Sequence, residues 1–517
     1  MNTLLVAPIV APLLSAALCL SVGRSRFARQ LIGVGGALAL LGVSIALMIA
    51  VWREGPMAVA IGGWRAPLGI ALVGDTLSAL MVLVAGIMGA VVAVYSLVDL
   101  EEHEQGNAFF PAYHVLLAGS CGAFLTADLF NLYVWFEVLI TASFVLLAMG
   151  RSRAQLEGAL KYVAINLIGS VILLGAVALT YAATKTLNMA DAALRLAWVA
   201  EDRPHLVLAI AALYGVAFGI KAALFPLFSW LPPSYPTPPA AVSAIFSGLL
   251  TKVGVYAFFR VFTMVLPASD AVFWVVLIIS CITMVMGVLG AVAQDQVRRI
   301  LSFHIVSQVG YMVAGVGLLS SADPGIRELA LAAGIFYTVH NIVAKGNLFL
   351  IAGAIERIGG SPHLEKLGGL AGRAPLWAGL FLISAFALAG IPPLSGFWAK
   401  LLIVWASFGA GQWWVGAIGL FVGLFTLISM LKIWNGAFWK PAPAEQECQE
   451  LSRSRTAVLA GPAIVLAAIS IGIGIMPRPL VAVAERAAAE LSSPAAYRAL
   501  LGIDSDVATV STTKETP

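Results

Sequence analysis

Residues 219–260 read GIKAALFPLFSWLPPSYPTPPAAVSAIFSGLLTKVGVYAFFR, and this stretch decides the kind of fold. Two apolar runs flank a segment rich in proline, and each run contains one lysine, Lys221 or Lys252. A surface helix of a soluble protein is apolar along one stripe, whereas a helix in a bilayer is apolar on almost every side. The stretch therefore predicts two membrane-spanning helices, the first of which is interrupted by prolines.

The composition of the whole chain agrees with a membrane protein. Of 517 residues, 61% are hydrophobic and 11% are charged, and the mean hydropathy is +0.96. Soluble domains have about 25% charged residues, so this chain is not a cytosolic enzyme or a disordered protein. The net charge of +4 is small and scattered, which excludes a nucleic-acid-binding surface. We therefore expect an all-α polytopic membrane protein in contact with the lipid bilayer.

The sequence predicts neither a cofactor nor a metal ion. Its four cysteines, Cys19, Cys121, Cys281 and Cys448, form no CxxC pair, so iron–sulfur and structural zinc sites are not expected. No GxGxxG motif follows a strand-like run, and no GxxxxGK[ST] motif occurs. Dinucleotide binding and ATP hydrolysis are therefore not indicated.

About 14 runs are long and apolar enough to be transmembrane helices, since a span needs about 20 such residues. They lie near 2–22, 31–52, 73–97, 111–127, 129–149, 159–182, 206–231, 240–266, 270–293, 300–319, 329–354, 376–406, 412–439 and 456–476. Two further segments, 186–203 and 480–501, mix apolar and charged positions, which predicts amphipathic helices at the membrane surface. The end of the chain, from about Ile503, is expected to be disordered.

The distribution of Lys and Arg predicts the orientation in the membrane. Thirteen basic residues lie in connections after odd-numbered spans, and six lie after even-numbered spans before the C-terminal tail. Cytoplasmic loops carry the excess of basic residues. We therefore expect a multi-pass protein of the cell inner (plasma) membrane with both termini extracytoplasmic.

The middle of the chain shows the pattern of two inverted five-helix repeats. The predicted parts are an N-terminal three-helix segment (1–110), a first repeat with spans 4–8 (111–266), a second repeat with spans 9–13 (267–440), and a final span with an amphipathic tail (441–517). Each repeat contains a broken helix, at FPLFSWLPPSYPTPP (225–239) and at AGIPPLSGFW (389–398). Inverted repeats with broken helices are typical of transporters, although Pro/Gly runs also simply end helices.

Six ionisable side chains inside the spans are the candidate functional residues. A charged side chain costs about 2.5 kcal/mol or more at the centre of a membrane helix, so each one needs a reason. The set contains one carboxylate and several lysines, whereas structural ion pairs would need similar numbers of acidic and basic side chains. Burial lowers a lysine pKa and a nearby carboxylate raises it again, which suits a proton relay. The six residues are Glu137, Lys221, Lys252, His340, Lys345 and Lys400.

Structural roles remain open for several of these residues. Lys221 and Lys400 lie beside helix breaks, where a lysine can neutralise freed carbonyls. His340 and Lys345 are five residues apart, about 140° around a helix, and need not share a face. Other charged side chains are expected to be interfacial, to anchor span ends or to cap a helix. These are His304 and Lys432 (interfacial), Arg260 and Lys161 (snorkelling anchors), and Asp75 (a cap).

Several long motifs resemble a known family. They are FLTADLFNLYVWFEVLITASFVLLA (124–148), the stretch at 219–260, FHIVSQVGYM (303–312), HNIVAKGNLFL (340–350) and AGIPPLSGFWAKL (389–401). The chain resembles the proton-translocating antiporter-like subunits shared by Mrp-type cation/proton antiporters and the membrane arm of respiratory complex I. The resemblance covers about 70–450, and APIVAPLLSAALCL (7–20) and GGWRAPLGIALVGDTLSALM (62–81) are most similar to the D-type Mrp subunits.

The resemblance implies roles for the six residues. Glu137 matches the family's key glutamate on span 5, Lys221 the broken-helix lysine on span 7, and Lys252 the lysine on span 8. His340 and Lys345 match relay positions on span 11, and Lys400 matches the lysine on span 12. In the family these residues form a polar axis that links half-channels on opposite sides of the membrane.

The function expected from the sequence is proton translocation within a multisubunit Na⁺ or K⁺/H⁺ antiporter, a secondary transporter rather than an enzyme. The partners implied are the other Mrp antiporter subunits, protons and monovalent cations. An alternative is a proton-pumping, antiporter-like subunit of an NADH-quinone oxidoreductase or a membrane-bound hydrogenase. A scaffold or a membrane-embedded transferase is a further alternative, and a transferase would require a polar catalytic cluster at a membrane face.

Overall fold

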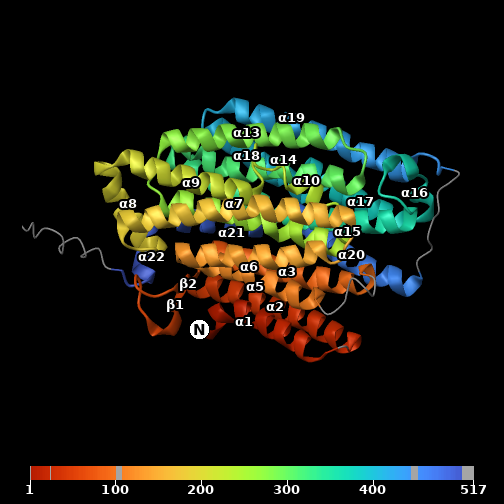
Figure 1. Ribbon diagram of the computed structural model, residues 1–517. Coiled ribbons are helices and arrows are strands. Elements are labelled where there is room, and N and C mark those ends of the chain that lie inside the picture. The colour runs from red at the N-terminus through yellow and green to blue at the C-terminus, as the bar shows by residue number, and fades with distance from the viewer. Residues whose placement is uncertain (1, 24, 101–107, 444–451, 504–517) are drawn as a thin grey trace, which may run out of the picture.

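The computed structural model describes residues 2–23, 25–100, 108–443 and 452–503, and these residues form a bundle of helices with one short sheet (Figure 1). Cys448 and the tail beyond Ile503 lie outside the described residues. The first half contains α1 (Asn2–Ser21), α2 (Arg26–Glu54), β1 (Met57–Ala60), η1 (Ile61–Gly63), β2 (Ala71–Gly74), α3 (Thr76–Asp99), α5 (Phe109–Leu125), α6 (Leu129–Ala148), α7 (Arg153–Thr184), α8 (Met189–Asp202), α9 (Pro204–Ala222), α10 (Leu231–Ser234), α11 (Ala240–Ile245), η2 (Phe246–Leu250), α12 (Thr251–Arg260) and η3 (Val261–Val265). The second half contains α13 (Asp270–Val292), α14 (Val297–Gly317), η4 (Leu318–Ser320), α15 (Pro324–Gly359), η5 (Leu364–Lys366), α16 (Leu370–Arg373), α17 (Pro375–Ala389), α18 (Ser395–Gly409), α19 (Trp413–Ile433), η6 (Trp434–Trp439), α20 (Arg453–Ile475), α21 (Arg478–Leu491) and α22 (Pro494–Leu500).

The predicted membrane spans are present as helices. Within the described residues, 12 helices are long and apolar enough to cross a membrane. Two predicted spans are represented by shorter apolar helices, α5 at span 4 and α17 at span 12, the latter followed by α18. The chain is thus a mostly helical, multi-pass membrane protein, and the inverted symmetry of its two repeats stays a prediction.

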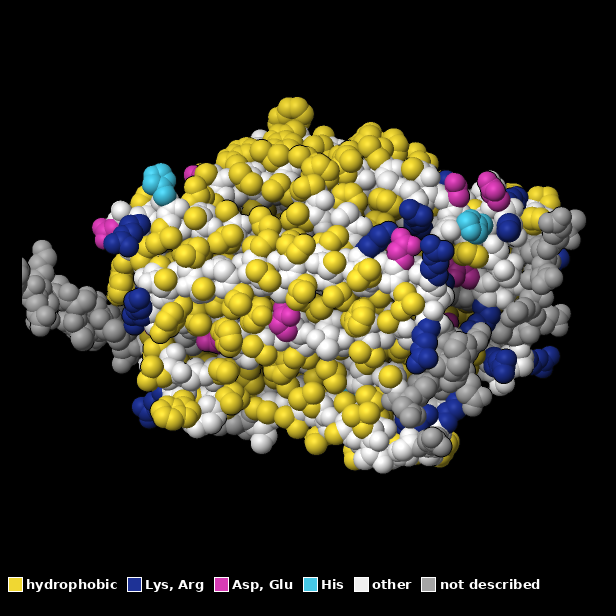
Figure 2. All heavy atoms as spheres, viewed as in Figure 1, with side chains coloured by type: hydrophobic (Ala, Val, Ile, Leu, Met, Phe, Trp, Pro, Cys, Tyr) yellow, Lys and Arg dark blue, Asp and Glu magenta, His cyan; other side chains and the backbone are white. Residues whose placement is uncertain are grey.

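Hydrophobic side chains cover the sides of the bundle. Figure 2 shows them as a broad band, with most Lys, Arg, Asp and Glu side chains towards the two ends of the molecule. Large apolar side chains on the outer helices, such as Leu160 (68% exposed) on α7 and Leu420 (60%) on α19, point away from the protein core. Such an apolar surface is satisfied by lipid rather than by water.

Connections predicted to share a side of the membrane lie at the same end of the bundle. Figure 1 shows β1, β2, α8 and α22 at one end, and α16 at the other. The first group follows even-numbered spans and α16 follows span 11. The relative topology of these connections therefore agrees with the predicted spans.

Both predicted helix breaks are observed. α9 ends at Ala222, and Ala223 takes a left-handed conformation (φ 63°) before the irregular residues that lead to α10. The indole Nε1 of Trp230 donates to the carbonyl oxygen of Ile220 at 2.9 Å. α17 ends at Ala389, and Gly390 has φ 91°. Carbonyls freed at a break need new donors in a membrane, and Trp230 is one of them.

The span at Ala240–Val265 is not a regular α-helix. It consists of α11, the π-helical segment η2, α12 and the π-helical segment η3. A π segment closes i→i+5 hydrogen bonds, and such segments are frequent at functional sites. Almost all of this span is buried inside the bundle, unlike the outer spans α7 and α13.

A short hairpin is an element that the sequence did not predict. β1 and β2 pair antiparallel with Met57 opposite Gly74, and the following helix begins at Thr76 rather than within a span from residue 73. Asp75 fixes this boundary because its side chain accepts from the backbone N–H of Ser78 at 2.8 Å. The start of predicted span 3 is therefore three residues too early.

The two amphipathic segments are helices with one buried face. On α21 the buried residues Ala484, Ala487, Ala488 and Leu491 follow helical spacing, and α21 packs against α15 and α3. On α8 the buried residues are 189–192 and Leu196, and Asp191 pairs with Arg195 at 3.0 Å. Both segments are therefore helical and amphipathic, and their position at the membrane surface stays a prediction.

Candidate functional site

Lys221 lies at the C-terminal end of α9, next to the first break, and is 4% exposed. Its Nζ donates to the hydroxyl of Ser170 at 2.8 Å and to the carbonyl oxygen of Asn166 at 3.5 Å, both on α7. The ammonium also lies 5.0 Å from the ring centroid of Phe136, a cation–π distance. All three partners are neutral, so this ammonium is held without a fixed counter-charge.

Glu137 follows Phe136 on α6 and is half-buried. Its Oε1 atom is buried and accepts no hydrogen bond from the protein. The carboxylate acts electrostatically on Lys221, but it does not form an ion pair with it within 4.0 Å. The two charges therefore interact across the gap between α6 and α9 without a direct ion pair.

Lys252 lies on α12 and is fully buried. Its Nζ donates to the carbonyl oxygen of Ser247, five residues earlier, at 2.6 Å. Ser247 belongs to the π-helical segment η2, so this segment supplies a backbone acceptor for the ammonium. Within the protein, Lys252 also has a neutral partner in place of a carboxylate.

The helices that carry Lys221 and Lys252 are in close contact at Gly254. A Cβ atom at Gly254 would lie 2.7 Å from the backbone nitrogen of Ala222 and 3.0 Å from the carbonyl carbon of Lys221. Since real Cβ atoms do not approach so closely, only glycine permits this contact. The first two lysines of the predicted axis are therefore on touching segments.

His340 and Lys345 on α15 are both fully buried and face different neighbours. The Nζ of Lys345 donates to the carbonyl oxygen of Leu301 on α14 at 3.1 Å, and the charge of Lys252 acts on it. His340 Nδ1 lies 2.8 Å from the hydroxyl of Ser395 on α18. The 140° separation expected from their spacing explains why they do not share a contact.

Lys400 lies on α18, just after the second break, and is 8% exposed. Its Nζ donates to the carbonyl oxygen of Ala389, the last residue of α17, at 2.6 Å. The ammonium lies 5.7 Å from the ring centroid of Tyr311, and its charge acts on His340 and His304. Lys400 therefore does neutralise a freed carbonyl, and it also lies within electrostatic reach of His340 on α15 and His304 on α14.

Two other charged residues of the spans, His304 and Lys432, are predicted to be interfacial. His304 is instead fully buried, and its Nε2 lies 2.5 Å from the hydroxyl of Ser429. That prediction is wrong because α14 is covered on all sides by other helices. Lys432 is half-buried and caps the end of α13, donating to Gln294 O at 2.7 Å, and it pairs with Asp295 at 2.7 Å.

Uncharged polar residues between these groups are a part of the site that the sequence did not predict. The hydroxyl of Tyr337 donates to Gln308 Oε1 at 2.5 Å, and Asn347 Nδ2 donates to Ser384 at 2.9 Å. Ser395, the partner of His340, also contacts Ser470 on α20 at 2.9 Å. In the sequence, only the presence of amide and hydroxyl side chains inside predicted spans could have indicated these residues. Such side chains do not stand out because they carry no charge.

Several polar atoms near the candidate residues are buried and lack a protein partner. An unsatisfied buried polar group costs about 1–3 kcal/mol, and buried water is the usual remedy. All of these atoms lie on α14 and α15, except that of Thr251, which is on α12. The atoms are Thr251 Oγ1, His304 Nδ1, Gln308 Nε2, His340 Nε2, Asn341 Oδ1 and Nδ2, and Asn347 Oδ1.

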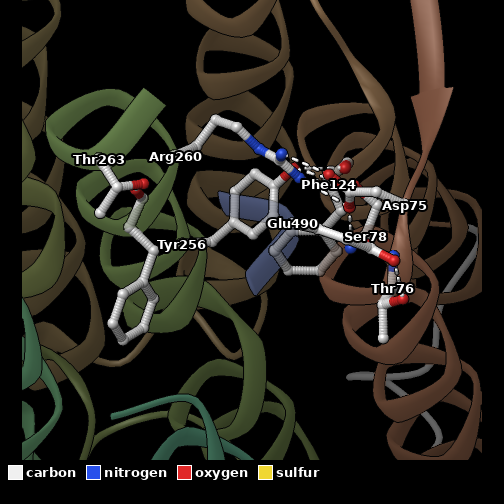
Figure 3. A network of polar contacts seen from close by, with 9 residues as sticks. Asp75, Thr76, Ser78, Phe124, Tyr256, Arg260, Thr263 and Glu490 are labelled. Atoms are coloured by element: carbon white, nitrogen blue, oxygen red, sulfur yellow. Dashed lines mark hydrogen bonds and ion pairs between the residues drawn. The ribbon is translucent and has the colours of Figure 1, made fainter. Parts of the chain in front are cut away.

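A separate polar network joins α3 to the end of α12 (Figure 3). The guanidinium of Arg260 forms an ion pair with Asp75 and donates to Ser78 and Tyr256 at 3.0 Å each. The hydroxyl of Tyr256 donates in turn to the carbonyl oxygen of Phe124 at 2.6 Å. Arg260 is 1% exposed, so the expectation that it snorkels to the membrane surface is wrong.

The C-terminal helices α21 and α22 also contact this network. Glu490 on α21 accepts from the backbone N–H and the hydroxyl of Thr76, at 2.7 Å each (Figure 3). The ring of Tyr497 on α22 lies 5.6 Å from the Arg260 guanidinium. Asp75 is therefore more than a cap, because it anchors α12 while its neighbour Thr76 anchors α21.

Substitution of Gly396 tests the second break. A Cβ there would lie 1.7 Å from the carbonyl oxygen of Ala387 and 2.9 Å from His340 Cε1. We expect Gly396→Ala to force α17 and α18 apart and to lower the thermal stability of the purified protein, as overpacking typically costs about 1–3 kcal/mol. Gly379→Ala, where a Cβ meets nothing within 4 Å, is the matched control. Equal melting temperatures for the two variants would contradict the observed packing.

The described residues contain no group of three or more His, Cys, Asp or Glu side chains that could hold a metal ion. Their cysteines Cys19, Cys121 and Cys281 are buried and free.

Comparison with known proteins identifies the family of this chain. The family model described as NADH:quinone oxidoreductase/Mrp antiporter, transmembrane, matches residues 126–426, more than half of the chain. The chain belongs to this family. All six candidate residues, from Glu137 to Lys400, lie within the matched region.

Individual family members are similar over almost the whole chain. The D-type Na⁺/H⁺ antiporter subunit of Alkalihalophilus pseudofirmus is 40% identical over 96% of this chain and 99% of its own. A chain in the structure of the Mrp complex from Dietzia is 32% identical with a TM-score of 0.86, covering 98% of this chain and 100% of its own. A chain of respiratory complex I from Thermus thermophilus is 25% identical with a TM-score of 0.77, covering 94% and 99%.

Proposed function

We propose that this protein is the proton-translocating subunit of a multisubunit monovalent cation (Na⁺ or K⁺)/H⁺ antiporter. The observation that carries the proposal is the row of buried lysines with neutral partners, coupled at one end to a glutamate, in a chain similar to D-type antiporter subunits. A lysine without a fixed counter-charge can release and regain a proton. The protein is a secondary transporter subunit rather than an enzyme.

The proposed path runs through both halves of the bundle. Protons reach Lys221 under the influence of Glu137, pass through Lys252 and His340 or Lys345, and leave by Lys400. The charge interactions between Lys252 and Lys345, and between Lys400 and His340, support this order of neighbours. Moving one charge through the membrane potential is worth about 2.3 kcal/mol per 100 mV, which can drive cation export.

Partner subunits complete the transporter. The solved relative is part of an Mrp complex, so we propose that this chain also assembles with other Mrp-type subunits. Cation movement is then handled by or shared with those partners, while this chain carries protons. The excess of basic residues after odd-numbered spans supports an inner (plasma) membrane orientation with both termini extracytoplasmic.

Antiport by the assembled complex tests the proposed function directly. The complex is reconstituted in vesicles that carry an internal pH dye, and Na⁺ or K⁺ is added outside. We expect cation-dependent proton movement that is absent from vesicles reconstituted without this chain. Proton movement that requires a quinone or another electron acceptor, and not a cation, would contradict the proposal.

The second candidate is a proton-pumping subunit of an NADH-quinone oxidoreductase or a membrane-bound hydrogenase. The observation that favours it is the likeness to a complex I chain. Mass spectrometry of the intact purified complex separates the two candidates. Flavin- or iron–sulfur-carrying subunits would support this candidate, and their replacement by small hydrophobic and antiporter-like subunits would support the antiporter.

A further inference from the structure

Three cavities on one side of the bundle are adjacent and share wall residues. The first, of about 550 Å³, lies between α9 and α13. The second, of about 200 Å³, shares Leu208, Ala211 and Val272 with it. The third, of about 540 Å³, shares Leu266 and Phe273 with the second. Since Phe262 lines all three, we call them the inner, middle and outer chambers of one groove.

The inner chamber is apolar and opens to the side of the bundle. Its lining side chains are entirely hydrophobic, apart from glycines such as Gly215 that leave room between the helices. Val216 on α9 (40% exposed) and Val275 on α13 (56%) lie at its edge and belong to membrane spans. Its volume is in the usual range for a small-molecule site, about 300–1,000 Å³. A hydrocarbon chain from the bilayer can enter it without crossing a polar barrier.

The outer chamber carries two arginines. Arg327, in the first turn of α15, and Arg498, in the last turn of α22, both line it, and no acidic side chain does. In the described part of the chain, neither guanidinium donates a side-chain hydrogen bond or forms an ion pair. The nearby carboxylate of Asp323 caps the backbone N–H of Gly325 at 2.8 Å. The chamber therefore has positive charge that an anion can satisfy.

We propose that the groove binds an anionic phospholipid, with an acyl chain in the inner chamber and the phosphate against Arg327 and Arg498. The apolar inner chamber corresponds to the acyl chain of a phospholipid, and the outer chamber with its two arginines corresponds to the phosphate at the end of that chain. Arginine is the side chain best suited to phosphate because its planar donors bind two oxygens at once. Basic pockets between transmembrane helices are known to bind anionic headgroups. The proposal requires a multi-pass membrane protein and is independent of the proton relay.

A phospholipid fits this groove better than an apolar helix of a partner subunit. A helix would fill the inner chamber but would offer no anion to the two partly buried guanidinium groups. A phospholipid fills the apolar chamber and neutralises the arginines with one molecule. A partner helix in the inner chamber is the competing occupant that the experiment distinguishes.

Native mass spectrometry of the intact, delipidated complex tests the proposal. The complex is titrated with palmitoyl-oleoyl phosphatidylglycerol or with the phosphatidylethanolamine of the same chains. We expect one phosphatidylglycerol that binds at least tenfold more tightly than phosphatidylethanolamine. The double variant Arg327→Gln/Arg498→Gln should lose this preference, and Gly215→Leu should weaken binding of both lipids at this site.

Matched controls separate the groove from general effects. Arg65→Gln removes an exposed arginine outside the groove, and Gly175→Leu adds the same side chain to α7 where a Cβ meets nothing within 4 Å. Both should bind phosphatidylglycerol as the unaltered complex does. Equal phosphatidylglycerol binding by the double arginine variant would overturn the proposal. Loss of a partner subunit from Gly215→Leu, with its lipid binding unchanged, would also overturn it and identify a partner helix as the occupant.

Discussion

Lys221→Ala is expected to abolish cation/proton antiport by the assembled complex. The ammonium of Lys221 is held by Ser170, Asn166 and the ring of Phe136, and alanine removes the proton carrier without replacing it. An increase of about 1.4 kcal/mol in the barrier already slows a step tenfold, so we expect at least that loss. The measurement is dye-reported proton movement in everted vesicles after addition of Na⁺ or K⁺.

Lys221→Arg distinguishes a relay from a structural cation. Arginine keeps the positive charge but does not release its proton at physiological pH, so the variant should assemble and remain inactive. Lys161→Ala is the matched control, because Lys161 is exposed and pairs with Glu157 on the surface of α7. Full antiport by Lys221→Arg would show that this position needs a charge and not a transferable proton.

Arg260→Met is expected to destabilise the protein more than any other single change in the Asp75 network. Removal of one partner of a buried ion pair leaves the other charge uncompensated, which costs about 3–5 kcal/mol. Burial raises the pKa of Asp75, but the Arg260 guanidinium overcomes this and holds it below its usual value. The pair therefore stabilises the fold at neutral pH and loses this contribution as pH falls through the lowered pKa. Thermal unfolding of the purified complex measures the loss.

The double variant Arg260→Met/Asp75→Asn tests whether the loss comes from the orphaned carboxylate. With both charges removed, most of the lost stability should return, since replacing a whole buried pair is often nearly neutral. Arg53→Met, at an exposed position in the last turn of α2, should leave the melting temperature unchanged. A single variant that melts like the control would contradict the role of this ion pair.

The spans are predictable from the sequence because membrane insertion constrains composition strongly. A helix in lipid must be apolar for about 20 residues, and 12 helices of this kind are observed in the described part of the chain. The broken helices are also predictable, since the prolines at 226 and 392–393 cannot continue a hydrogen-bonded helix. The hairpin at β1 and β2 is not, because its strands are only four residues long.

The candidate residues are predictable because an ionisable side chain in a membrane helix costs free energy and so needs a reason. Their hydrogen-bond partners are not predictable. A lysine such as Lys252 stands out in an apolar run, whereas its acceptor is the backbone carbonyl of Ser247, which no sequence pattern marks. The π segment that creates this contact leaves no local signature either. The prediction for Arg260 is wrong because its partner Asp75 lies 185 residues away, and only the fold brings them together.

The ends of α3 have a mechanical consequence for the span at Ala240–Val265. At one end Asp75 holds Arg260, and at the other the Asp99 carboxylate accepts from the backbone N–H of Ala241 at 2.8 Å. Asp75 caps the start of α3 and Asp99 is its last residue, so the two attachments are one helix length apart. The span at Ala240–Val265 runs antiparallel to α3 and is held at both of these points. Axial sliding of that span in either direction would break both attachments at once. The two attachments therefore oppose an axial movement of the helix that carries Lys252, and they leave its side chains free to change rotamer.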